Sequence, residues 1–227
     1  MKSTAAAGLL ALLACQVHAE EPVDDLSPWT VRLGVAAVQF DTNSTAELPT
    51  GVTVPGASIG VKNNTSIGAD VVYELTPSWR VHFAFGIPPT TSMRAEGSLA
   101  GYVRPNGPLT GVLGKSRYAP LMLTASYKLG NIGGVIPYVG AGINYTWVMK
   151  NSDGDLSGFS AKSAWGTVIQ AGIDIPIDQR WGIFFDARKV FVKTTGTGNV
   201  TALGGVPARA NVTLNPLIIV AGVSYRF

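Results

Sequence analysis

The feature that most constrains the fold is an alternation of apolar with polar or small side chains. Between residues 65 and 75 the odd positions are mostly apolar, whereas the even positions carry Ser, Gly, Asp, Val and Glu. Residues 79–87 repeat the pattern, with Trp, Val, Phe, Phe and Ile alternating with Arg, His, Ala and Gly. Successive side chains of a β-strand point to opposite faces, so each segment predicts a strand with one apolar face. Six further segments fit: 29–40, 120–129, 136–147, 163–175, 181–191 and 214–227.

The connections between these eight predicted strands alternate between short and long. Residues 76–78, 130–135 and 176–180 form short turns, whereas 41–64, 88–119, 148–162 and 192–213 are long. This is the topology of an outer-membrane barrel, and strands of this length exceed the ~9–11 residues that cross a bilayer. No segment after the leader has 18 consecutive apolar residues, so no transmembrane helix is expected. The predicted fold is an all-β, eight-stranded antiparallel transmembrane β-barrel with short periplasmic turns and four long extracellular loops.

A soluble β-sandwich or barrel would alternate in the same way, but its polar face would need many charges. Only 14% of the residues are charged, against roughly 25% in ordinary soluble domains. Aromatic residues also recur at strand ends, where an interfacial girdle of a membrane barrel lies. They are Trp29, Tyr73, Trp79, Tyr127, Trp147, Trp181, Tyr225 and Phe227.

The N-terminal residues have the pattern of a secretory signal. A positive start at Lys2 is followed by a short apolar stretch and by Val17-His18-Ala19, which fits cleavage after Ala19. We therefore expect a signal peptide at 1–19 and an outer-membrane barrel domain at 20–227. The run before Cys15, the only cysteine, loosely matches a lipidation box and leaves cleavage before that residue as an alternative.

Several stretches resemble the OmpW family of small outer-membrane proteins. The most specific is the run PYVGAGINYT at residues 137–146; others lie at 67–73, 165–174, 186–188 and 215–227. One departure is the run RYAP at 117–120, where the resemblance leads us to expect a His-Leu-Pro-Pro-like sequence. The resemblance implies an eight-stranded barrel whose narrow, largely apolar lumen admits small hydrophobic molecules.

The alternation assigns an unusual set of charged residues to the lumen. Buried charges must be paired, and the interior of an eight-stranded barrel is just wide enough for side chains to fill. We therefore expect a neutralising ion-pair network that plugs the barrel, with a polar conduit as the alternative. The predicted charged plug comprises Arg32, Asp70, Glu74, Arg80, His82, Asp174, Asp186 and Arg188, and Lys128 and Arg226 also point inward by alternation.

Nearer the long loops, the inward positions are apolar. Such side chains can line a pocket for hydrophobic solutes, although ordinary packing of the upper barrel is the alternative. The predicted apolar path comprises Val38, Phe40, Ala84, Val168, Phe184, Val190, Leu214 and Ile218. We expect a channel or pocket for uptake of small hydrophobic molecules, with lateral release into the membrane above the plug. The second hypothesis is a sealed structural barrel that acts through its loops as a surface receptor or adhesion protein.

Other classes of function find little support. His82 is the only histidine after the leader, and no serine is expected beside it, so no catalytic residues and no enzyme are predicted. No His/Cys cluster indicates a metal, and no cofactor is expected. The net charge of +3 includes no basic run, which argues against nucleic acid. Expected partners are outer-membrane lipid and lipopolysaccharide, small hydrophobic solutes, and the outer-membrane assembly machinery through the C-terminal Phe227.

Overall fold

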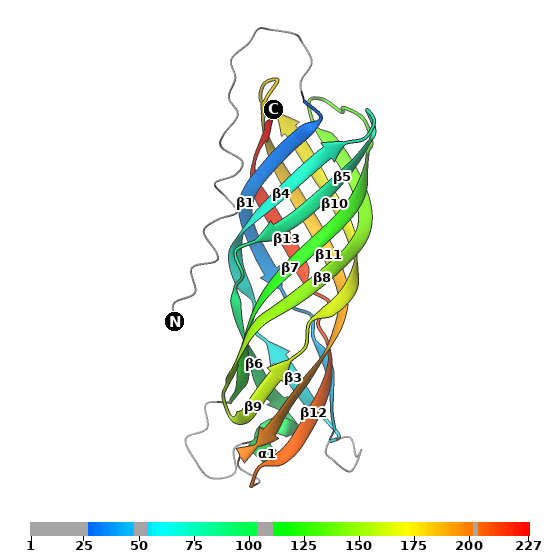
Figure 1. Ribbon diagram of the computed structural model, residues 1–227. Helices are drawn as coiled ribbons and strands as arrows, with labels where there is room; N and C mark the ends of the chain where they lie inside the picture. The colour runs from blue at the N-terminus through cyan, green and yellow to red at the C-terminus, as the bar shows by residue number, and fades with distance from the viewer. Residues whose placement is uncertain (1–26, 48–53, 104–110, 202–203) are drawn as a thin grey trace, which may run out of the picture.

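In the computed structural model, which describes residues 27–47, 54–103, 111–201 and 204–227, eight antiparallel strands close into a barrel (Figure 1). Each pairs with two neighbours in the cyclic order β1-β4-β5-β7-β8-β10-β11-β13, and the β1–β13 ladder closes the ring. The strands are β1 (Trp29–Gln39), β4 (Asn64–Glu74), β5 (Trp79–Gly86), β7 (Val112–Lys128), β8 (Ile136–Asp153), β10 (Ala164–Pro176), β11 (Trp181–Val200) and β13 (Leu217–Arg226). The predicted eight-stranded barrel is confirmed.

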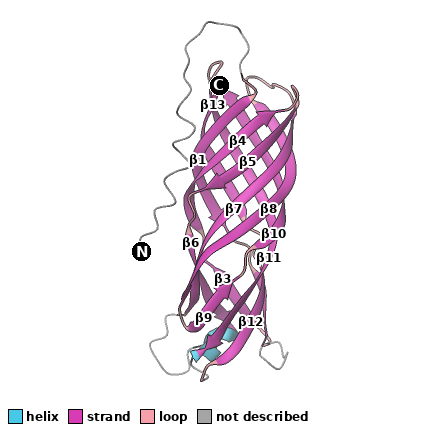
Figure 2. Cartoon of the chain, in the orientation of Figure 1, coloured by secondary structure: helices cyan, strands magenta, loops and turns pink. Residues whose placement is uncertain are grey.

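The four long connections contain more regular structure than the sequence analysis expects. They include β2 (Asn43–Glu47), β3 (Ala57–Val61), β6 (Thr90–Gly97), the short helix α1 (Ser98–Val103), β9 (Leu156–Ala161) and β12 (Val206–Thr213). Together with the ends of β7, β8 and β11, these strands extend the barrel at the end away from the C-terminus (Figure 2). The reason is that alternation continues beyond the barrel, as in β12, where buried Ala210 and Val212 alternate with exposed residues.

This extension consists of two sheets rather than one closed wall. One contains β3, β6 and the ends of β7 and β8, and the other contains β9, β12, β2 and the end of β11. No ladder joins β2 to β3 or β8 to β9 among the described residues. The extension therefore continues the lumen, but its wall has two places where neighbouring described strands share no ladder.

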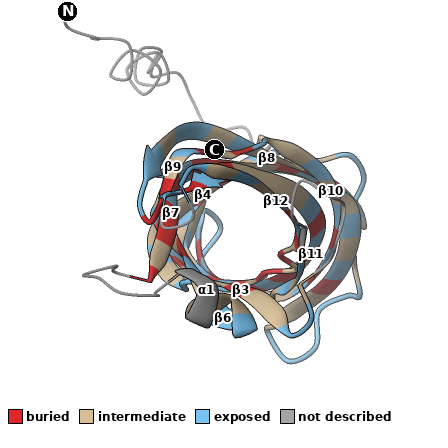
Figure 3. Ribbon diagram, turned by 90° about the horizontal axis from the view of Figure 1, so that it is seen from below, coloured by how far each residue is buried: buried red, intermediate tan, exposed pale blue. Residues whose placement is uncertain are grey.

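The two faces of the barrel wall differ in polarity. Viewed along the axis, the strands form a ring around the lumen, and buried and exposed residues alternate along them, as in β5 and β11 (Figure 3). The outer face carries large exposed apolar side chains, including Val35 at 59% and Ile169 at 54% exposure. Along β11, the exposed aromatic residues Trp181 and Phe191 are ten residues apart. That separation corresponds to ~33 Å along a strand and to about 25 Å across a bilayer at a tilt of ~40°.

The strand ends beside the C-terminus carry an aromatic belt. Trp29 packs on Tyr73 and Trp79 on Tyr127, with ring centroids 4.6 Å and 5.2 Å apart. The backbone N–H of Phe227 donates to the carbonyl oxygen of Trp29 at 3.2 Å, which fixes the end of β13 beside β1. No described helix is long and apolar enough to cross a membrane. The predicted signal peptide at 1–19 lies outside the described residues.

Candidate functional site

A compact layer of charged side chains crosses the lumen; we call it the charged floor. Its three arginines and three aspartates balance in formal charge. Arg32 and Arg80 both contact the carboxylate of Asp174, at 2.9 Å and 2.6 Å. The second group is held by Arg188, which donates from Nη2 to Asp70 Oδ2 and from Nε to Asp186 Oδ1, each at 2.7 Å. Apart from the slightly more open Asp174, all these side chains are at most 5% exposed.

Two uncharged residues that were not singled out from the sequence contact the ion pairs, and one of them, Tyr138, joins the two groups. The hydroxyl of Tyr138 donates to Asp186 Oδ2 at 2.5 Å and accepts from Arg32 Nη1 at 3.0 Å. The guanidinium of Arg80 lies 4.3 Å from the centre of the same ring. Gln170 Nε2 also donates to Asp186 Oδ2, at 2.6 Å. Both residues stand at inward positions of the alternation, which was the signal available in the sequence.

A close approach explains how a ring as large as that of Tyr138 fits into so narrow a lumen. Tyr138 lies opposite Gly172 in the β8–β10 ladder. A Cβ atom at Gly172 would stand 2.4 Å from the tyrosine hydroxyl oxygen, far inside van der Waals contact. The glycine is therefore needed for the ring to lie across the barrel.

The structure corrects the expectation that no serine neighbours His82. Ser126 Oγ lies 2.7 Å from His82 Nε2, and Asp70 Oδ2 lies 3.1 Å from His82 Nδ1. The β5–β7 register places Ser126 opposite Arg80 and beside His82, on the same inward face. His82 and Ser126 are both 0% exposed, so this arrangement belongs to the charged floor and has no access for a substrate.

Glu74 lies apart from the charged floor, nearer the short turns. Its Oε2 accepts from Lys128 Nζ at 2.5 Å, and both side chains are partly exposed. Arg226 donates from Nε to the carbonyl oxygen of Ser27 at 3.0 Å. Of the eight residues predicted for the charged plug, seven therefore meet in one network, and Glu74 forms a separate pair near the short turns.

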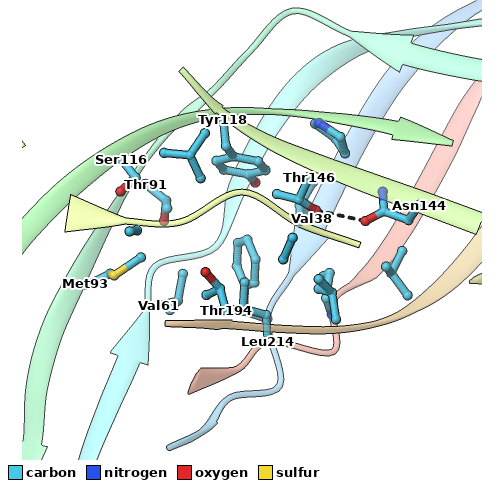
Figure 4. A pocket seen from close by; sticks show the side chains of 18 of the residues that line it. Val38, Val61, Thr91, Met93, Ser116, Tyr118, Asn144, Thr146, Thr194 and Leu214 are labelled. Atoms are coloured by element: carbon cyan, nitrogen blue, oxygen red, sulfur yellow. Dashed lines mark hydrogen bonds between the residues drawn. The ribbon is translucent and has the colours of Figure 1, made fainter. Parts of the chain in front are cut away.

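On the other side of the charged floor, toward the extension, the lumen opens into an apolar cavity, which we call the upper pocket (Figure 4). It contains about 670 Å³ of empty space, its open mouth included. Polar groups in its wall are engaged with one another: Asn144 Oδ1 accepts from Thr146 Oγ1 at 2.8 Å, and Tyr118 OH accepts from Asn64 Nδ2 at 3.0 Å. Five residues of the predicted apolar path line it: Val38, Phe40, Val190, Leu214 and Ile218.

A second cavity, the side pocket, adjoins the upper pocket and shares four lining residues with it: Val38, Tyr118, Pro120 and Ile218. Ala84 and Phe184 of the predicted path line this cavity. Val168 lines neither pocket, but is buried in the same apolar cluster. Tyr118 and Pro120 were not expected in a pocket wall; they fall in the run that departs from the OmpW-like pattern.

The side pocket is lined from both faces of the barrel wall. Ala84 points inward, whereas Phe85 and Ile87 are exposed on the outer face. The β4–β5 ladder ends at the pair Gly68–Gly86, and the β5–β7 ladder ends at Ala84. Two prolines, 88 and 89, follow, and a proline has no N–H to continue a ladder. The wall is therefore interrupted between the end of β5 and β7, whereas the backbone N–H of Ile87 still donates to the carbonyl oxygen of Ile67 on β4 at 2.9 Å.

A closed antiparallel barrel of eight strands, with an apolar outer face and a charged lumen, is a small outer-membrane β-barrel protein. The sequence matches the OmpW family over residues 28–227, and the chain belongs to that family. It is accordingly a non-enzymatic protein of the outer membrane of Gram-negative bacteria, as the sequence predicts.

Individual relatives agree with this assignment. The chain is 37% identical to the dibenzothiophene metabolism operon protein PahQ of Pseudomonas aeruginosa, over 95% of this chain and 93% of that one. It is 29% identical to outer membrane protein W of Escherichia coli, over 74% and 75% of the two chains. The crystal structure of OprG from Pseudomonas aeruginosa superposes with a TM-score of 0.78 at 22% identity, covering 89% of this chain and 97% of OprG. That likeness supports the fold.

Proposed function

We propose that the barrel takes up small hydrophobic molecules and releases them sideways into the membrane. The observation that carries this proposal is the continuity between the upper pocket and the side pocket, which share Val38, Tyr118, Pro120 and Ile218. A solute that enters from the extension can move between apolar walls until it reaches the interrupted part of the barrel wall.

The entrance is supplied by the extension. An outer pocket lies between its two sheets, lined by Ile59, Leu113, Leu156, Phe159 and other residues, and contains about 520 Å³ of empty space. Met93 lines both this cavity and the upper pocket. Three apolar cavities thus follow one another from the outer end of the molecule to the membrane.

The charged floor sets the direction of release. Transfer of an apolar solute is favourable when apolar surface leaves water, and a network of paired charges offers no such surface. Asp70 and Arg188 line the side pocket at its inner end, so a solute there meets the ion pairs on one side and lipid-facing Ile67 and Ile87 on the other. Sideways exit is the favourable path.

The named relatives suggest the chemical class of the solute. PahQ is a dibenzothiophene metabolism operon protein, and dibenzothiophene is a flat, uncharged aromatic molecule. A wall of Val, Phe, Leu, Ile and Met side chains with its polar groups engaged suits molecules of this kind. We therefore propose small uncharged aromatic molecules, sulfur heterocycles such as dibenzothiophene included, rather than sugars or amino acids, as the transported class.

The test compares intact cells that express the protein with cells that lack it. The initial rate of uptake of labelled dibenzothiophene should rise with expression, whereas uptake of a polar solute of similar size should not. In planar bilayers the purified barrel should show little ion conductance, because the charged floor fills the lumen. Equal dibenzothiophene uptake with and without the protein, or uptake of polar solutes alone, would overturn the proposal. A sealed barrel that still mediates surface binding would support the receptor hypothesis instead.

Recognition of the C-terminal Phe227 by the outer-membrane assembly machinery is a separate prediction. Phe227 is 52% exposed and its ring packs against Tyr225 at 5.3 Å, in a T-shaped contact. The terminal aromatic side chain is therefore available at the end of β13. Its deletion should lower the amount of folded protein in the outer membrane.

A further inference from the structure

Two positively charged residues face each other on the outside of the barrel. Arg117 on β7 lies directly opposite Lys150 on β8, and both side chains are exposed. Like charges in opposing positions of a ladder destabilise the pairing. Lys115 follows on the same face of β7, opposite Ser152, and Arg94 on the neighbouring strand β6 is also exposed. We call Arg94, Lys115, Arg117 and Lys150 the cationic patch.

No carboxylate of the described residues pairs with the cationic patch at ion-pair distance. The carboxylate of Asp153 on β8 accepts from the backbone N–H groups of Gly158 and Phe159, at 3.0 Å and 2.8 Å. The carboxylate of Glu96 on β6 lies against Gly60 of β3, the residue opposite Arg94, so it stands beside that arginine without forming an ion pair. Three positive charges on two adjacent strands are thus left without a carboxylate partner among the described residues, in a chain whose net charge is only +3: Lys115, Arg117 and Lys150.

The height of the patch on the barrel matches the outer edge of the membrane. Along β7, Arg117 lies ten residues from Tyr127, which belongs to the aromatic belt beside the C-terminus. Ten residues span ~33 Å along a strand and about 25 Å across the bilayer at a tilt of ~40°, which is the height of the apolar band. On β8, exposed Trp147 lies three residues below Lys150, as expected at an interface.

We propose that the cationic patch binds the phosphate groups of lipopolysaccharide in the outer leaflet. Arginine presents a planar fork that suits phosphate oxygens, and lysine adds a point charge. Below the patch, exposed Leu123 and Ile143 form an apolar surface for acyl chains. An anion held between Arg117 and Lys150 removes the repulsion between them. A phosphorylated glycolipid fits both the charge above and the apolar surface below.

The site would have a consequence for the barrel wall. The backbone carbonyl oxygen of Pro88, in the interrupted part of the wall, accepts from Arg117 Nε at 3.4 Å. A phosphate held by Arg117 would therefore lie next to the side pocket. Bound lipopolysaccharide would flank the place where the wall is interrupted.

The test measures binding of lipid A to the full-length mature protein in phosphatidylcholine nanodiscs. The variant carries Arg117→Gln and Lys150→Gln together, and the matched control carries Lys193→Gln and Arg209→Gln on β11 and β12. Each basic residue near an anionic surface adds to the binding affinity. Because the double variant loses two of them, it should bind diphosphorylated lipid A roughly thirtyfold more weakly than the wild type. The control should bind like the wild type, and all three proteins should show the same heat-dependent mobility shift on gels.

Two further measurements identify the ligand. Lipid A without phosphate groups should bind wild type and double variant equally and weakly, and inorganic phosphate at the same concentration should not displace diphosphorylated lipid A. Equal binding of diphosphorylated lipid A to wild type and double variant would overturn the proposal, as would displacement by inorganic phosphate, which would indicate a site for the free anion. Dibenzothiophene uptake is not part of this measurement, so its outcome is independent of the proposed transport function.

Discussion

Arg188 reaches from β11 to the carboxylate of Asp70 on β4, with 2.7 Å between Nη2 and Oδ2. In the ring of strands, β13 and β1 lie between these two strands. The contact therefore crosses the lumen and does not join two neighbouring strands. The same guanidinium holds Asp186 on its own strand. One side chain thus forms ion pairs with two buried carboxylates.

The first prediction concerns this shared arginine. Arg188→Ala leaves two buried carboxylates without their strongest partner, and loss of one member of a buried ion pair costs about 3–5 kcal/mol. We expect a loss of that size in the free energy of unfolding, measured by urea titration with gel mobility in lipid vesicles. The control is Lys128→Ala, which breaks the partly exposed pair with Glu74 and should cost about 1 kcal/mol or less. Equal losses in both variants would contradict a tightly coupled charged floor.

The second prediction tests whether Ser126 has a structural role or a catalytic one. This hydroxyl lies 2.7 Å from His82 Nε2 and accepts from Arg80 Nε at 3.3 Å. Ser126→Ala leaves buried polar atoms unpartnered and should destabilise the barrel by about 1–3 kcal/mol. Dibenzothiophene uptake should not change, and the wild type should neither hydrolyse esters nor react with a fluorophosphonate probe. Labelling of Ser126 would show that the site is accessible, contrary to its burial.

The sequence could predict the barrel but not the shape of its passage. Strict alternation defines the inward face of every strand, so the buried positions of Arg32, Val38 and Val190 follow from residue order alone. Contacts across the lumen, such as Arg188 with Asp70, depend on the shear of the closed sheet, which alternation does not reveal. Tyr138 was missed because its role depends on space left by Gly172, on another strand.

The interruption in the barrel wall could not be predicted from the sequence either. Proline residues at 88 and 89 are visible there, but they stand inside a long connection whose strands were not expected. Only the observed ladders show that β5 stops pairing before β6 begins. The extra strands were underestimated because short alternating segments such as β9 and β12 are interspersed with glycine, proline and asparagine.

The third prediction tests the upper pocket. Val190→Phe places a ring in the cavity that Val190 lines, whereas Val35→Phe adds the same ring to the lipid-facing side of β1, where Val35 is 59% exposed. The first variant should lower the initial rate of dibenzothiophene uptake, and the second should leave it at the wild-type rate. Overpacking a buried site costs about 1–3 kcal/mol, so folded protein is quantified by gel mobility before rates are compared. Unchanged uptake by folded Val190→Phe protein would exclude the upper pocket from the path.

The fourth prediction addresses the exit through the wall. Gly68 lines the side pocket, and a Cβ atom there would meet only ordinary contacts, the nearest being Ala36 Cβ at 3.6 Å. Gly68→Leu is therefore expected to fold while its longer side chain fills the side pocket. Ala125→Leu, which adds bulk to the lipid face of β7, is the control. Uptake of dibenzothiophene should fall to the rate of cells without the protein only in the first variant. Binding of the solute to the purified protein, measured by equilibrium dialysis of the labelled solute, should persist because the upper pocket is intact. If the variant lost both uptake and solute binding, the block would lie at the entrance. If its uptake were equal to that of the wild type, solutes would leave by another route.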